Sequence, residues 1–197
     1  MTSADVEAIV ATMTTAFFDD PMWGPAFPDV ERRAAQASAF WRLLVTSALR
    51  YPWTFVTPNV ESAAVWIPPG GVELTHEEED GLEEFLVGIT DRTVADGILA
   101  IFDQFEAAHP SEPHYYLSLL ATHDDHRGHG HGMALLTENL ARIDAVRMPA
   151  YLESCNPANN KRYASLGFTA RDSITLASGH TVTTMWRPAR TSSHFRG

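Results

Sequence analysis

The sequence predicts one domain of the α/β class, and three observations lead to this prediction. Long stretches of the first half repeat apolar residues at helical spacing. Two pairs of short apolar runs, each separated by turn residues, predict β-hairpins at 53–67 and 168–187. A strand-like run at 115–122 leads through a glycine-rich segment into another helical pattern. A chain of 197 residues with both helical and strand patterns is of the right length for one domain in which helices and strands share a core.

The first half is predicted to hold four helices and one hairpin. The helices span about 3–17, 29–49, 75–89 and 93–108, and the strands span 53–57 and 62–67. Prolines and glycines at 68–71 end the hairpin. Thr75 and Glu78 form a capping box, and the dense charge run at 75–84 predicts a solvated start to the third helix.

A turn-rich piece at 18–28 separates the first two helices. Its prolines disfavour regular structure, and it carries more aromatic side chains than an ordinary surface loop. We therefore expect a packed loop. Phe17, Trp23 and Phe27 either line a substrate pocket or contribute to packing alone.

The charge and cysteine content exclude several functions. The formal net charge is −11 at pH 7, whereas nucleic acid and anionic membrane surfaces need a basic face, so neither partner is expected. The charge is compatible with a cationic substrate, although solubility alone also explains it. The single cysteine, Cys155, excludes an internal disulfide. With no signal segment and no apolar run of about 18 residues, the chain is expected to be cytoplasmic.

The segment 123–132, with the sequence HDDHRGHGHG, carries the strongest functional signal. Gly128, Gly130 and Gly132 alternate between a predicted strand and a predicted helix, so the backbone can come close to a bound group. The free N–H groups at the helix start then make an anion site that suits phosphate. The spacing excludes a P-loop, which needs Lys-Ser/Thr after the last glycine, and the G-x-G-x-x-G of dinucleotide folds.

A second motif follows the helix predicted at 131–146. A strand at 150–154 leads to Asn156-Pro157, which opens a short helix that ends before Gly167, and strands at 168–176 and 181–187 complete the chain's core. Together, R-x-x-G-x-G at 127–132 and N-P-x-N-x-x-x-Y-x-x-L-G-F at 156–168 resemble the paired motifs of the GNAT superfamily of acetyl-CoA-dependent N-acetyltransferases. The resemblance is greatest to the puromycin N-acetyltransferase group, through E-P-x-x-x-L at 112–117 and L-E-S at 152–154.

This resemblance implies a mixed, mostly antiparallel central sheet with helices on both faces and a splay between its two central strands. Residues 1–197 would form a single acetyltransferase domain, with 1–110 as the acceptor-side half and 114–188 as the acetyl-CoA-binding core. Family members usually begin with a strand, which here would be short or absent because the first helix starts so early. The implied coenzyme-binding residues are Leu120, Ala121, Thr122, Arg127, Gly128, His129, Gly130, His131, Gly132, Asn156 and Asn159.

The resemblance also implies the catalytic roles. Attack of an amine on a thioester needs an oxyanion donor, a base for the amine and an acid for the departing thiolate. A backbone amide at 120–122 would polarise the carbonyl, and Tyr163 would protonate the thiolate. Glu153, beside the expected thioester, is the first candidate for the base and His123 the second, with a structural role as the alternative for Glu153. Direct transfer is expected because Cys155 has no evident activating partner.

The expected reaction is transfer of an acetyl group from acetyl-CoA to a primary amine of a small molecule, such as an amine antibiotic or an aminoacyl compound. A peptide or a polyamine is the alternative acceptor, and the protein would be a monomer or a homodimer. Two other functions compete: an acyl-CoA-binding sensor without turnover, and a zinc-dependent hydrolase that uses the His123–His131 cluster. Zinc leaves the alternating glycines and the second motif unexplained, so no metal is expected.

Overall fold

The computed structural model describes residues 3–190, so both ends of the predicted domain, 1–2 and 191–197, lie outside the described residues. The helices are α1 (Ser3–Phe17), α2 (Trp23–Ala26), α3 (Val30–Ala48), α4 (His76–Asp80), α5 (Leu82–Ile89), α6 (Arg92–Ala108), α7 (His131–Ala145) and α8 (Asn160–Ser165), with short 3₁₀ turns η1 (Asp124–His126) and η2 (Pro157–Asn159). The strands are β1 (Thr54–Val56), β2 (Ser62–Ile67), β3 (Tyr115–Thr122), β4 (Ala150–Ser154), β5 (Thr169–Thr175) and β6 (Thr181–Arg187).

Most predicted elements are present, and the differences have local causes. The turn-rich piece contains the short helix α2, which starts where the Asp20 side chain accepts hydrogen bonds from the N–H groups of Met22 and Trp23. The helix predicted at 75–89 is interrupted at Gly81, between α4 and α5, and its predicted capping box forms. Glycine is a poor helix former, which explains the interruption.

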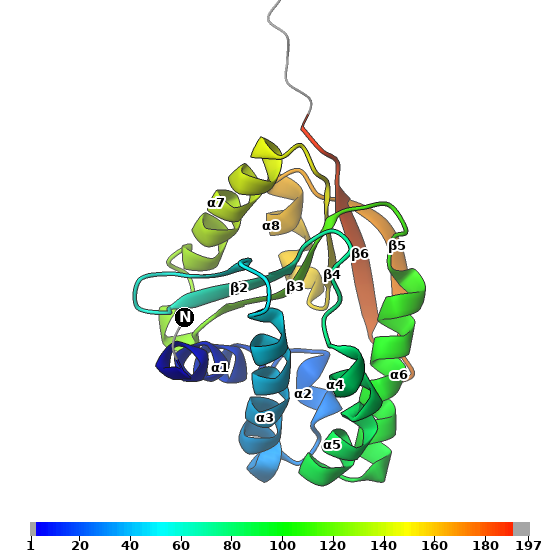
Figure 1. Cartoon of the computed structure of the whole chain (residues 1–197). Coiled ribbons are helices and arrows are strands. Elements are labelled where there is room, and N and C mark those ends of the chain that lie inside the picture. The colour runs from blue at the N-terminus through cyan, green and yellow to red at the C-terminus, as the bar shows by residue number, and fades with distance from the viewer. Residues whose placement is uncertain (1–2, 191–197) are drawn as a thin grey trace, which may run out of the picture.

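Six strands form one open sheet in the order β1-β2-β3-β4-β6-β5 (Figure 1). Every neighbouring pair is antiparallel except β3 and β4. These two central strands are paired only at Tyr115 with Ala150 and at Tyr116 with Tyr151, after which they separate. The mixed, mostly antiparallel sheet and its splay are therefore as expected, and the first strand follows α3 within the described residues.

A β-bulge interrupts β3 just beyond the last pair with β4. Val65 of β2 faces Leu119, whereas the next residue, Trp66, faces Leu117, so Ser118 is the extra residue. A bulge bends its strand and leaves the extra residue outside the ladder. The bulge therefore lies where the pairing of β3 with β4 has ended and the splay begins.

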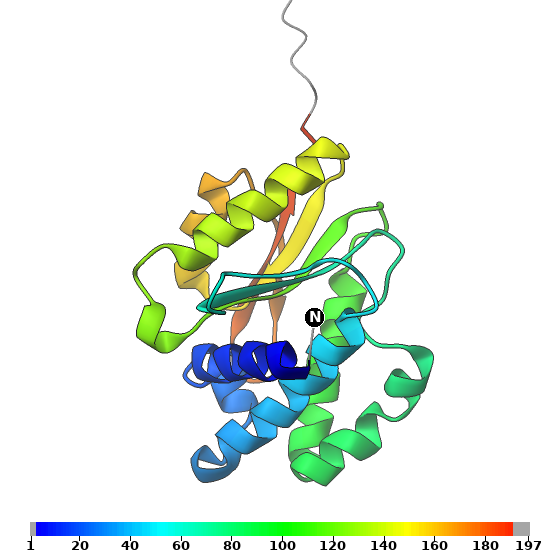
Figure 2. The same cartoon turned by 60° about the vertical axis from the view of Figure 1, so that its left-hand side comes forward.

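Helices cover both faces of the sheet, as Figure 2 shows from the side. Helices α1, α2, α3, α5 and α6 pack on one face around a core that includes Phe40, Trp41 and Leu86, whereas α4 has no buried residue. Helix α7 packs on the other face, where the buried Trp66 donates a 2.9 Å hydrogen bond from Nε1 to Asn139 Oδ1. Within residues 3–190, none of the helices has the length and apolar character needed to cross a membrane.

Candidate active site

A cleft of about 510 Å³ opens beside the glycine loop, where β3 and β4 separate. The end of β3, the start of α7, the η2–α8 segment and the end of α1 form its walls. Ten of the eleven predicted coenzyme-binding residues line it, and Tyr163 from α8 lines it with them. The ten are Leu120, Ala121, Thr122, Arg127, Gly128, Gly130, His131, Gly132, Asn156 and Asn159.

The glycines of the loop meet two different requirements. Gly128 and Gly130 have φ angles of 82° and 81°, a left-handed conformation that side chains disfavour, and a Cβ atom at either position would face open space. Gly130 is the N-cap of α7, so the free N–H groups of the first turn face the cleft's mouth. At Gly132 a Cβ atom would lie 2.7 Å from Thr122 Oγ1, so its small size lets α7 approach β3.

Arg127 holds the glycine loop against the first helix. Its guanidinium lies 2.8 Å from Asp124 Oδ1 and donates a 2.7 Å hydrogen bond to the carbonyl oxygen of Ala16. The side chain is still half exposed and lines the cleft, as does Arg162 of α8, against a single lining carboxylate, Asp20. The charged lining of this cleft is therefore net positive and suits an anionic ligand.

His129 is the predicted coenzyme-binding residue that does not line the cleft. Its exposed ring lies on the loop's outer side, with Nδ1 3.3 Å from the carbonyl oxygen of His126. His123 follows the end of β3 and lines neither this cleft nor the two cavities described below. Its Nδ1 accepts a 3.3 Å hydrogen bond from the Asp125 N–H. The part of the chain that the structure describes contains no group of three His, Cys, Asp or Glu side chains arranged to hold a metal ion.

The second motif builds the opposite wall of the cleft. Asn156 Oδ1 accepts a 3.0 Å hydrogen bond from the Ala158 N–H, so this side chain caps the η2 turn while it lines the cleft. Asn159 accepts from Arg162. Tyr163 packs edge-on against Phe168 with ring centroids 6.2 Å apart, and burial raises the pKa of its hydroxyl, which therefore stays protonated at neutral pH.

Glu153 lies in a separate chamber of about 30 Å³, which residues of α3, α6, β3 and β4 line. Its side chain is 2% exposed, and burial raises its pKa to about 8, although the Tyr151 and Tyr116 hydroxyls act in the opposite direction. His109 Nδ1 lies 3.9 Å from Glu153 Oε1. A carboxyl with a pKa near 8 can take up a proton at neutral to slightly alkaline pH, as a general base must.

Cys155 follows Glu153 and also lines this chamber. Burial and nearby carboxylates raise the pKa of its thiol well above the usual value, with Asp20 the first of these carboxylates. The thiol points at the Glu153 carbonyl oxygen, 3.7 Å away. A protonated, buried thiol is a poor nucleophile, in agreement with direct transfer.

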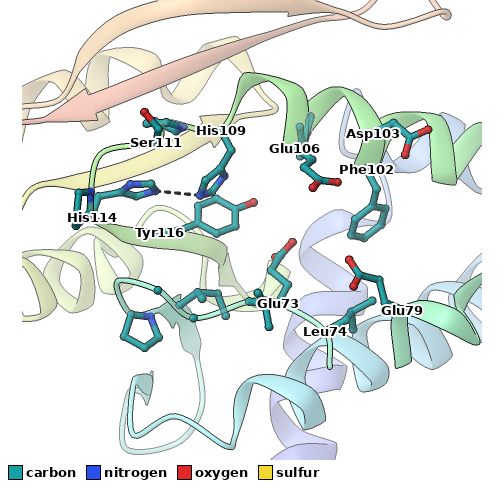
Figure 3. A pocket seen from close by; sticks show the side chains of 18 of the residues that line it. Glu73, Leu74, Glu79, Phe102, Asp103, Glu106, His109, Ser111, His114 and Tyr116 are labelled. Carbon is teal, nitrogen blue, oxygen red and sulfur yellow. Dashed lines mark hydrogen bonds between the residues drawn. The ribbon is translucent and has the colours of Figure 1, made fainter. Parts of the chain in front are cut away.

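A larger cavity of about 670 Å³, hereafter the acceptor cavity, adjoins the chamber of Glu153 (Figure 3). The two share Glu73, Phe102, Phe105 and Tyr116 as lining residues. The cavity lies between the loop that follows β2, helix α6 and the segment that leads into β3. The sequence pointed to none of these residues as a site, because they come from separate segments that only the fold brings together.

The aromatic residues considered for a substrate pocket have three different positions. Trp23 lines the Glu153 chamber, whereas Phe17 lines the cleft beside the glycine loop. Phe27 is 1% exposed and packs against Phe40, with ring centroids 5.7 Å apart, so its role is packing.

An open sheet that splays beside a glycine loop, with a cleft at that loop, is the architecture of an acyl-coenzyme A-dependent transferase. Comparison with known proteins agrees with this class. The model of the acetyltransferase (GNAT) family matches residues 48–168, and the chain belongs to this family.

Solved structures share the fold over nearly the whole chain. A Corynebacterium glutamicum protein described as histone acetyltransferase HPA2 and related acetyltransferase is 25% identical with a TM-score of 0.70, over 98% of this chain and 96% of that chain. Arylalkylamine N-acetyltransferase 2 from Aedes aegypti is 12% identical with a TM-score of 0.62, over 96% and 97%. A polyamine N-acetyltransferase from Drosophila melanogaster is 15% identical with a TM-score of 0.57, over 95% and 97%.

Proposed function

We propose that this protein transfers an acetyl group from acetyl-CoA directly to a primary amine of a small molecule. The observation that carries the proposal is the opposite charge of two cavities, the glycine-loop cleft and the acceptor cavity that adjoins the Glu153 chamber. The glycine-loop cleft has two arginines against one aspartate, whereas the acceptor cavity has five carboxylates and, among its described lining residues, no arginine or lysine. An anionic coenzyme and a cationic amine would therefore enter from different sides.

The residues of the glycine-loop cleft fit coenzyme A. Open space around Gly128 and Gly130 leaves room for a pyrophosphate against the first turn of α7. Arg127 and Arg162 add positive charge, and Leu120 to Thr122 line the path from the loop to the splay. We propose that residues 114–188 supply most of this site, together with the end of α1, and that α6 and the preceding loop supply most of the acceptor side.

The proposed chemistry divides between the Glu153 chamber and the glycine-loop cleft. The amine nitrogen attacks the thioester carbonyl, so a C–N bond forms while the C–S bond breaks. The Glu153 carboxylate takes a proton from the nitrogen, and the Tyr163 hydroxyl gives a proton to the departing thiolate. A backbone N–H of residues 120–122 stabilises the charge that develops on the carbonyl oxygen, a contribution of about 3 kcal/mol for one donor.

The acceptor is a small amine in this proposal, because the acceptor cavity holds about 670 Å³ between α6 and the 109–116 segment. The sequence resemblance to the puromycin N-acetyltransferase group supports an amine antibiotic or an aminoacyl compound. A sensor that binds acyl-CoA without turnover would need the cleft but not the buried base, so Glu153 and its raised pKa favour an enzyme.

Calorimetric titration of the purified, chelator-treated protein with acetyl-CoA, and then with zinc, tests the proposal. We expect micromolar binding of acetyl-CoA and, in a second assay, thiol release that depends on an added amine. Coenzyme binding without thiol release for any amine in a broad panel would favour the sensor. Tight zinc uptake without coenzyme binding would favour the hydrolase.

Replacing Tyr163 with phenylalanine tests the proposed acid. We expect kcat to fall by about tenfold to a hundredfold, because water must then protonate the thiolate. The acetyl-CoA Kd should stay within about twofold, since phenylalanine keeps the packing against Phe168. Stopped-flow thiol release and calorimetry separate the two effects, and an unchanged kcat would remove Tyr163 from the chemistry.

A further inference from the structure

The acceptor cavity combines an apolar lining with charge of a single sign. Its apolar surface comes from α5, α6 and the loop after β2, and the residues that provide it are Leu74, Leu82, Leu99, Phe102 and Phe105. Its five carboxylates face no lysine or arginine within the described lining. A ligand that matches both features carries positive charge on a hydrocarbon segment.

The histidines of the cavity do not supply the missing positive charge. Burial, with a smaller contribution from His114, lowers the pKa of His109 to about 4, and burial also lowers the pKa of His114. Their Nε2 atoms lie 3.0 Å apart, a separation that suits one shared hydrogen between two neutral rings. Both rings are therefore uncharged near pH 7.

Two of the five carboxylates already have arginine neighbours. Glu112 lies 3.4 Å from Arg171 in an exposed ion pair. Arg50 donates a hydrogen bond to the Glu73 carbonyl oxygen and lowers the pKa of the Glu73 side chain, although burial, the larger effect, raises it. Ser118, the extra residue of the β-bulge, donates a hydrogen bond to the same carboxylate.

The other three carboxylates have no arginine or lysine partner in the described structure. They are Glu79, whose neighbour is His76 at 3.7 Å, and Asp103 and Glu106 of α6. In Figure 3 the carboxylates of Glu79 and Glu106 point into the space beside the Phe102 ring. Aromatic faces and carboxylates together are typical surroundings of an ammonium group.

Glu153 gives an independent sign of an amine ligand at the other end of this space. Its side chain is 2% exposed, and Oε1 has no hydrogen-bond partner in the described structure. It lines the chamber that shares Glu73 and Tyr116 with the acceptor cavity. A buried carboxyl oxygen without a donor costs free energy, and an N–H group of an incoming amine would supply the missing hydrogen bond.

We propose that the acceptor carries a second positive charge, so that it is a diamine or polyamine whose distal ammonium binds among Glu79, Asp103 and Glu106. This proposal rests on the proposed function, because the reacting nitrogen is taken to lie at Glu153. The hydrocarbon spacer packs between these ends against the apolar lining of the acceptor cavity.

The geometry of α6 sets the length of the spacer. His109, the C-cap of α6, lies beside Glu153 and marks the reacting end. At 1.5 Å per helical residue, Glu106 and Asp103 lie about 4.5 Å and about 9 Å from His109 along the helix. Aliphatic diamines such as putrescine and cadaverine span this range, whereas a much shorter diamine would leave the distal carboxylates without a partner.

Matched amines test the proposal, with acetyl-CoA saturating and thiol release as the readout. We expect kcat/KM for cadaverine to exceed that for pentylamine, which has the same carbon chain, by about tenfold, because several partly exposed ion pairs each contribute a few-fold. Glu79→Gln and Glu106→Gln should each lower this ratio by about two- to threefold. Glu84→Gln, which removes an exposed charge of α5 outside the cavity, should leave the ratio unchanged.

Calorimetry of the same amines with the protein bound to coenzyme A separates this proposal from the proposed function. Tighter binding of cadaverine than of pentylamine, weakened by Glu106→Gln, would support the dication site even if no thiol were released, a result that would overturn the transferase alone. Equal kcat/KM and equal affinity for the two amines, or a preference that survives both glutamine variants, would overturn the dication site.

Discussion

Glu153→Gln should lower kcat/KM for amine acetylation by about 10²- to 10⁴-fold, the usual contribution of a general base. The amide keeps the shape of the buried side chain but cannot take a proton from the amine. Glu138→Gln, a charge-matched change on the exposed surface of α7, should leave turnover intact. Turnover close to that of the unmodified protein in Glu153→Gln would show that another group, or water, is the base.

The proposed role of Glu153 as the base also predicts how kcat/KM depends on pH. Glu153 acts in its deprotonated form, and its pKa is raised to about 8, so kcat/KM should rise with pH and level off above about pH 8. The folded protein binds this proton more tightly than the unfolded chain does. Ionisation of the carboxyl as pH rises therefore lowers the free energy of unfolding. Glu153→Gln should therefore raise the melting temperature more at about pH 9 than at about pH 5, as differential scanning fluorimetry would measure.

Gly130→Asp should raise the Kd for acetyl-CoA by at least about tenfold. A carboxylate at the N-cap of α7 would repel the pyrophosphate and occupy the open space that faces the cleft. The helix itself tolerates aspartate at this end, because negative charge there favours the helix dipole. Isothermal titration with acetyl-CoA measures the effect.

Gly179→Asp is the matched control for this variant. Gly179 has a φ angle of 83°, and a Cβ atom there would also face open space, so the backbone strain is the same as at Gly130. Gly179 lies in the turn between β5 and β6 and does not line the cleft. Equal loss of affinity in both variants would assign the effect to strain and would contradict a phosphate site at the loop.

Most of the fold was predictable because helices and strands follow from local patterns in the sequence. Apolar periodicity gave the helices and strands to within a few residues, and the two motifs gave the splay through their family resemblance. The bulge at Ser118 was missed because β3 reads as a continuous apolar run with one serine, and only the pairing with β2 reveals the extra residue. Helix α2 was missed because it is a single short turn, stabilised by Asp20, with prolines both inside it and on either side.

The candidate site, too, was predictable only in part. The glycine-loop cleft is formed largely by residues close in sequence, so its composition was predictable. The acceptor cavity was not, because Glu79 was interpreted as part of a solvated charge run and Glu106 lies in a predicted helix to which no site was assigned. Exposed acidic residues on a helix look alike in sequence, whether they face bulk water or a cavity that residues 109–116 complete.

The short pairing of β3 with β4 leaves two rows of backbone groups without a partner strand. Beyond Tyr116 and Tyr151, the N–H groups that face the splay are held by no ladder, although the outer edges of both strands are paired. Their amide hydrogens should exchange with solvent faster than those of β6, which is paired on both edges. Acetyl-CoA should slow this exchange at 117–122 and leave 181–187 unchanged in hydrogen–deuterium exchange mass spectrometry, so that the coenzyme completes the sheet as a strand would.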